Sequence, residues 1–102
     1  MLPNEAWIKA LFRGPSEETR KIACKDPQCA IKYAIHVDKE PRDDTRKAAC
    51  IDSYHAYLYA KDVDEGPHKD TRKAACKKPF HAYWYALHID KKPRDDTRKV
   101  AC

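Results

Sequence analysis

Apolar side chains recur along this chain at helical spacing. Between residues 27 and 38, Ala30, Ala34 and Val37 stand at i, i+4 and i+7, with Tyr33 beside them. Apolar and polar residues do not alternate there as they do in a half-buried strand. The pattern therefore predicts a helix with one apolar stripe. The same stripe recurs at Ala56, Ala60 and Val63 and again at Ala82, Ala86 and Ile89.

The stripe belongs to an internal repeat with a constant 26-residue step. The sequence TRKAAC at 45–50 returns at 71–76, and its variants TRKIAC and TRKVAC stand at 19–24 and 97–102. A fixed period of about 20 to 50 residues indicates stacked units, each of which buries its apolar face against its neighbours. The question is whether TRKAAC is a site used four times or a scaffold built four times.

Each unit should hold two short helices. The first follows an aligned proline, as in PRDDTRKAAC at 41–50, where acids precede Arg and Lys in an order that suits the helix dipole. The second begins in the next loop, where Asp26 or Asp52 can cap it. The expected helices are 4–13, 15–25, 27–38, 41–51, 53–64, 67–77, 79–90 and 93–102.

These elements predict an all-α fold. We expect a right-handed-type α-solenoid of stacked short helix pairs, with about eight helices, in a single repeat domain spanning 1–102. The segment 1–18 is expected to be an N-terminal cap half-unit. The repeats follow at 19–44, 45–70 and 71–96, and 97–102 forms a terminal half-unit.

The alternation of YAIHVD, YAKDVD and YALHID with RKIAC, RKAAC and RKVAC resembles known tandem repeats. It is similar in plan to the HEAT and tetratricopeptide classes. It more closely resembles short tandem helix-pair repeats in uncharacterised bacterial, phage and large-virus proteins. The resemblance implies an architecture and a habit of binding other macromolecules. With the small size of the chain, it favours a phage or viral inhibitor of a host or defence factor.

Composition narrows the class of protein. The apolar fraction of 42% leans on Ala and Tyr, which predicts a thin, layered core. No apolar run approaches the roughly 18 residues of a membrane span, and residues 1–14 do not read as a signal peptide. We therefore expect a cytoplasmic protein with no membrane partner and with its five cysteines as thiols. The net charge of +5 permits a nucleic-acid or acidic-protein partner without requiring one.

The repeated basic residues allow two interpretations. Arg20, Arg46, Arg72 and Arg98 can each pair with an acid of the same or an adjacent unit. Two sets of acids recur at the same period and are open as partners: Glu18, Asp44, Asp70 and Asp96, or Asp38, Asp64 and Asp90. Exposed pairs of this kind contribute only about 0–1 kcal/mol each. Alternatively, Arg and Lys form a basic ridge that follows a phosphate backbone, with binding that weakens steeply in salt. The ridge would consist of Arg20, Arg46, Arg72 and Arg98 with Lys21, Lys47, Lys73 and Lys99. The ridge residues expected to bind are Arg46, Lys47, Arg72 and Lys73.

The cysteines and histidines favour packing over metal binding. Cys is among the most buried residue types and packs as a small hydrophobe. Each unit offers three potential ligands, as in Cys76, His81 and His88, but none has the paired spacing that zinc sites use. The last two lie seven residues apart on one helix, about 10 Å along its axis. We therefore expect no metal and no cofactor.

Aromatic residues give the strongest interaction signal. Three in a row at 83–85 span about 200° of a helix, so they cannot all face one core, and Trp84 is the one expected to point outward or into a groove. Exposed Trp and Tyr are frequent hot spots of protein interfaces. An alternative is that they cover neighbouring helices in a thin core. The aromatic residues expected to bind a partner are Tyr57, Tyr59, Tyr83, Trp84 and Tyr85.

These signals favour a non-enzymatic interaction module that binds a protein partner. No nucleophile elbow or glycine-rich phosphate loop is present, since Gly14 and Gly66 stand at turns before prolines. The alternative is a nucleic-acid-binding protein that uses the Lys/Arg ridge. A third hypothesis is self-association, because a helix that stops at Cys102 would leave a face for another copy.

Overall fold

The computed structural model describes residues 1–90 of the chain, and this part is all-helical, as the sequence predicts. It holds seven α-helices and no strand within those residues. The expected eighth helix, at 93–102, lies outside the described residues. The helices are α1 (Pro3–Arg13), α2 (Glu17–Ala23), α3 (Pro27–Tyr33), α4 (Asp43–Ala49), α5 (Ser53–Tyr59), α6 (Lys69–Ala75) and α7 (Pro79–Tyr85).

The second helix of each unit ends in a π-helical turn. These turns are η1 (Ala34–Asp38), η2 (Ala60–Asp64) and η3 (Ala86–Asp90). The sequence predicts one continuous helix for each of these stretches, and the structure divides each into an α part and a π part. Left-handed residues follow the first two turns, Lys39 at φ 57° and Glu65 at φ 54°, and reverse the chain toward the next unit.

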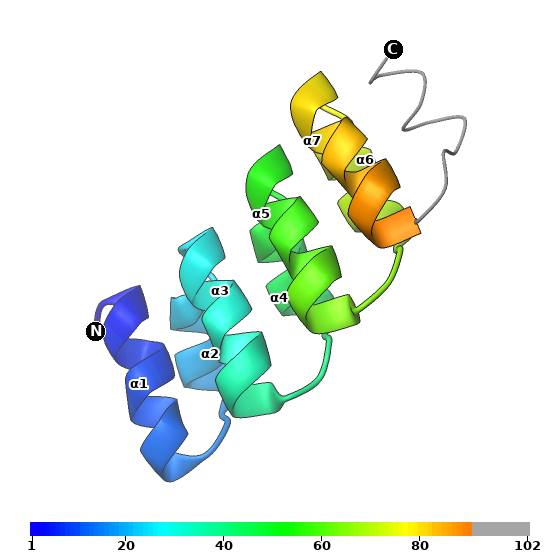
Figure 1. Ribbon diagram of the computed structural model, residues 1–102. Helices are drawn as coiled ribbons and strands as arrows, with labels where there is room; N and C mark the ends of the chain where they lie inside the picture. Colours follow the sequence, from blue (N-terminus) through cyan, green and yellow to red (C-terminus); the bar gives the residue numbers. More distant parts are fainter. Residues whose placement is uncertain (91–102) are drawn as a thin grey trace.

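The helices lie in two layers (Figure 1). One layer holds α1, α3, α5 and α7 side by side and running in the same direction, and α2, α4 and α6 lie behind it. Each of α1, α3 and α5 packs against the helix that follows it, so the chain is a series of helix pairs. The molecule measures 45 × 19 × 16 Å, with the pairs succeeding one another along the long axis.

Small side chains let these layers approach closely. Ala23, Ala30, Ala49, Ala56 and Ala75 are fully buried between the helices. Three apolar clusters lie at successive junctions, and each combines alanines with buried tyrosines of the second-helix layer, namely Tyr33 in one, Tyr59 in another, and Tyr57 with Tyr85 in the third. The core is therefore thin and layered, as the Ala- and Tyr-rich composition predicts.

The helix starts confirm one expectation and correct another. Asp26 accepts the Gln28 N–H at 2.9 Å and Asp52 accepts the His55 N–H at 2.8 Å, so both act as the predicted N-caps. The first helix of each unit, however, begins two residues after the aligned proline. The N-cap residue there has extended backbone, with φ −147°, −139° and −142° at Ser16, Arg42 and His68. Its backbone polar groups bind a tyrosine, as described below.

Candidate interaction surface

In the three TRK triplets that the structure describes, the threonine anchors a tyrosine of the same unit. Its Oγ1 lies 2.8, 2.7 and 2.8 Å from the tyrosine hydroxyl in the pairs Thr19–Tyr33, Thr45–Tyr59 and Thr71–Tyr85. All three tyrosines are fully buried. The hydroxyl also accepts the backbone N–H and contacts the carbonyl of the N-cap residue, which for Tyr59 means Arg42 at 3.0 and 3.1 Å. Each buried hydroxyl is therefore fully hydrogen-bonded.

The arginine of the triplet completes this arrangement with a bidentate ion pair. Arg46 donates from Nε and Nη2 to the two Asp64 oxygens at 3.0 and 2.6 Å, and Arg20 makes the same contacts with Asp38. The guanidinium also lies over the tyrosine ring, 5.6 Å from its centroid in Arg46–Tyr59. The hydrogen bonds with Asp64 raise the pKa of Arg46 above its ordinary value, so its charge is permanent.

The π turn explains how one guanidinium reaches both partners. Tyr59 and Asp64 are five residues apart. On a regular α-helix, residues five apart point in directions about 140° different. A π turn, with its i to i+5 hydrogen bonds, brings them to nearly the same side. We call the set of Thr, Tyr, Arg and Asp side chains the clamp, and it is complete in the described residues for Thr19/Arg20/Tyr33/Asp38 and Thr45/Arg46/Tyr59/Asp64.

The clamp removes four predicted binding residues from the surface. Arg46 and Arg72 are buried, and the ion-pair interpretation of the arginines is confirmed for Arg20 and Arg46. Tyr59 and Tyr85 lie in the core, because they face the inner helix layer beside the alanine stripe. TRKAAC is thus a scaffold element in which Thr, Arg and the second Ala are buried.

Tyr57 also differs from its expected position. It is buried because α7 covers it, with the Trp84 ring 5.6 Å away and the His88 ring 6.3 Å away. Two further predicted binding residues, Tyr83 and Trp84, lie on α7 itself. Trp84 is half-buried, while Tyr83 is exposed.

The predicted lysines are exposed but share their surroundings with acids. Lys47 and Lys73 line a shallow hollow between α4 and α6, which also contains Lys77, Asp43 and Asp70. The two carboxylates offset part of the positive potential. A continuous Lys/Arg ridge is therefore not present on this face of the described residues, because Arg46 and Arg72 are buried and the lysines share their hollow with two acids.

Cys24 and Cys50 lie half-buried at the junctions between units. Burial, aided by the nearby carboxylates of Asp44 and Asp70, raises the pKa of each thiol from an ordinary value of 9.0 to about 11. The Cys24 Sγ donates to the Asp44 carbonyl at 3.7 Å. Within residues 1–90, no three His, Cys, Asp or Glu side chains gather as a metal site would require.

The raised thiol pKa predicts slow alkylation. At pH 8, iodoacetamide should modify Cys24 and Cys50 at least tenfold more slowly in the folded protein than in urea, because the thiolate is the reactive form. The fold favours the protonated thiol, so its stabilising contribution is complete below pH 9 and is lost as the pH rises through about 11. Peptide mass spectrometry gives the rate at each cysteine. Equal rates in folded and unfolded protein would contradict the prediction.

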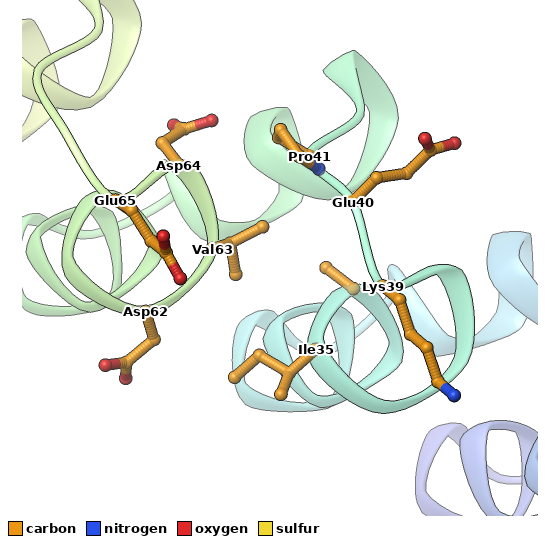
Figure 2. Close-up of a pocket in the computed structure, with 9 residues that line it drawn as sticks. Ile35, Lys39, Glu40, Pro41, Asp62, Val63, Asp64 and Glu65 are labelled. Atoms are coloured by element: carbon orange, nitrogen blue, oxygen red, sulfur yellow. The ribbon is translucent and has the colours of Figure 1, made fainter.

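A second hollow opens between the ends of η1 and η2 (Figure 2). Ile35 and Val63 form its apolar part, and Glu40, Asp62 and Glu65 lie around it. Asp64 also borders the hollow, but its carboxylate is already bonded to Arg46. The hollow is therefore a junction between units with an acidic rim.

Exposed aromatic rings gather on the outer face of α5 and α7. Phe80 packs against Trp84 with centroids 4.5 Å apart, and His81 lies 5.7 Å from both Trp84 and Tyr54. His81 also bonds the Ser53 hydroxyl through Nδ1, which ties the two helices together. We call Tyr54, Phe80, His81 and Trp84 the aromatic surface. It combines exposed rings with a fixed arrangement, as interface hot spots do.

Sequence reasoning placed only Trp84 of this surface among the binding residues. Tyr54 and Phe80 occupy the same position of successive repeats, next to the start of the second helix. An aromatic residue repeated at a position outside the alanine stripe is the signal that identifies them.

No helix of the described residues has the length and the apolar run needed to cross a bilayer. Comparisons of the chain with protein-family models, with curated proteins and with solved structures gave no match.

Proposed function

We propose that this protein is a non-enzymatic interaction module that binds a protein partner through the aromatic surface. The observation that carries the proposal is the set of rings held between α5 and α7, with Phe80 and Tyr54 exposed and Trp84 half-buried. A rigid aromatic group loses little conformational entropy on binding and buries a large area, which is why such groups dominate interface energies.

The fold supports this role, because the clamp that holds each helix pair together does not use the residues of the aromatic surface. In the first two repeats the clamp side chains are buried and bonded to one another. The outer face of the second helices carries side chains that vary between units. Where α7 has Phe80 and Trp84, α3 has Gln28 and Lys32. A constant interior with a variable outer face is typical of repeat proteins that recognise partners.

The architecture proposed to underlie this role is a right-handed-type α-solenoid of short helix pairs. Support comes from the constant 26-residue step and from the way that α3, α5 and α7 follow one another in one layer. In a solenoid, each unit contacts only its neighbours, so one outer face can be changed without disturbing the rest.

Nucleic-acid binding through Lys47 and Lys73 has less support. Both lysines are exposed, but Asp43 and Asp70 share their hollow and the neighbouring arginines are buried. Fluorescence anisotropy of labelled single- and double-stranded DNA and RNA at about 50 and 200 mM salt measures this directly. We expect weak binding that is lost at the higher salt.

The protein partner is best sought in two steps. Binding proteins are first captured with the intact protein and identified by mass spectrometry, and each is then purified and titrated by calorimetry. We expect the double variant Tyr54→Ala, Phe80→Ala to weaken the titrated affinity at least tenfold, and the binding to persist at 200 mM salt. Ile51→Ala is the matched control, because Ile51 is an exposed apolar residue that does not belong to the aromatic surface. Unchanged affinity in the double variant would overturn the proposal.

A further inference from the structure

The outward side of α7 carries repeat positions that are covered by the next unit on α3 and α5. Ile31, Tyr57 and Tyr83 occupy the same position in three successive repeats. Ile31 and Tyr57 are each 6% exposed because the next unit covers them, whereas Tyr83 is 55% exposed. Leu87, one helical turn further along, is also exposed. We call Tyr83 and Leu87 the α7 end face.

The outward side of α1, at the opposite end of the stack, is also apolar. Ala6 and Ala10 turn toward the core, and the other side of the helix carries Ile8, Leu11 and Phe12. Phe12 is 86% exposed. We call Ile8, Leu11 and Phe12 the α1 end face. Both end faces therefore present exposed apolar side chains.

We propose that a second copy of this chain stacks head to tail on the first, with its α1 end face against the α7 end face. The contact would continue an arrangement that the chain already uses at α1–α3, α3–α5 and α5–α7, where parallel helices of the same layer pack side by side. This inference uses residues outside the aromatic surface and does not depend on the proposed protein partner.

Charges at matching ends of the two helices favour this pairing. Glu5 lies in the first turn of α1, and Lys78 is the N-cap residue of α7 with Lys77 before it. Because the stacked helices would be parallel, these opposite charges would meet at the same end of the contact. The two faces differ from each other, so the contact is heterologous and adds copies in an open series.

Sedimentation velocity of the intact protein between about 5 and 500 µM tests the proposal. The mass is expected to rise with concentration from the 11.8 kDa of one chain through twice and three times that value. Phe12→Glu and Tyr83→Glu each block one end face and should each give a monomer over the whole range. Both side chains are exposed, so both variants should keep the circular dichroism spectrum of the parent.

Mixing the two variants distinguishes a head-to-tail contact from a symmetric one. Each variant keeps one intact face, so an equimolar mixture should form a dimer and nothing larger. A wild-type protein that stays monomeric at 500 µM would overturn the proposal. The end faces would then be covered by another protein or by another part of the chain. A mixture that stays monomeric, or self-association that survives Phe12→Glu, would also overturn it.

Discussion

Replacing Asp64 by Ala should lower the free energy of unfolding by about 3–5 kcal/mol, the cost of leaving a buried charge without its partner. Arg46 is buried and makes two hydrogen bonds to Asp64, at 3.0 and 2.6 Å. Its remaining side-chain hydrogen bond, to Asp43 at 2.8 Å, reaches a carboxylate that is fully exposed and screened by water. A small domain has a total stability of only about 5–15 kcal/mol, so the loss should be large in a urea titration followed by circular dichroism.

Asp62→Ala is the matched control for this variant. Asp62 lies on the same π turn, is exposed, and should change stability by no more than about 0.5 kcal/mol. A second comparison replaces the whole pair, with Asp64→Leu and Arg46→Met. Because no charge is then left buried, the double variant should be more stable than Asp64→Ala. Equal stabilities of Asp64→Ala and Asp62→Ala would show that the ion pair contributes nothing measurable.

The helices could be predicted from the sequence because their signals are local and repeated. The alanine stripes set the inner face of each second helix, and Asp26 and Asp52 mark two of the helix starts. The 26-residue step then transfers each inference to the other units. The π turns could not be predicted in this way. A π turn adds one residue without a local marker, and here it is stabilised by contacts between residues such as Arg46 and Asp64, 18 positions apart.

The surface residues were harder to place, since their exposure depends on the neighbouring unit. Tyr57 and Tyr83 hold the same repeat position, but one is covered by α7 and the other is exposed. Tyr59 and Tyr85 were expected at an interface because tyrosine is common there. Only their hydrogen bonds with Thr45 and Thr71 show that they belong to the interior. A tyrosine that follows the threonine of its unit at the same distance every time is the pattern that could have identified them.

A second prediction concerns what the hydroxyl of one clamp tyrosine, Tyr59, contributes to the free energy of unfolding. Tyr59→Phe keeps the buried ring and removes the group that accepts the Arg42 N–H at 3.0 Å and bonds Thr45 Oγ1 at 2.7 Å. Leaving a buried polar group unsatisfied costs about 1–3 kcal/mol, and we expect a loss of that size in the urea titration. Burial raises the pKa of Tyr59, so its hydroxyl stays protonated and this loss should be constant between pH 6 and 8.

Amide hydrogen exchange shows where the effect of Tyr59→Phe arises. The Arg42 amide should lose protection by more than the global change in stability explains, because its acceptor is gone. The equivalent amides of Ser16 and His68 keep their own tyrosines and should follow the global change alone. Tyr54→Phe, on the same helix but exposed, should leave all three amides unchanged. If Arg42 were to keep its protection in Tyr59→Phe, the tyrosine hydroxyl would not be what fixes the start of α4, and the aligned proline would have to do so.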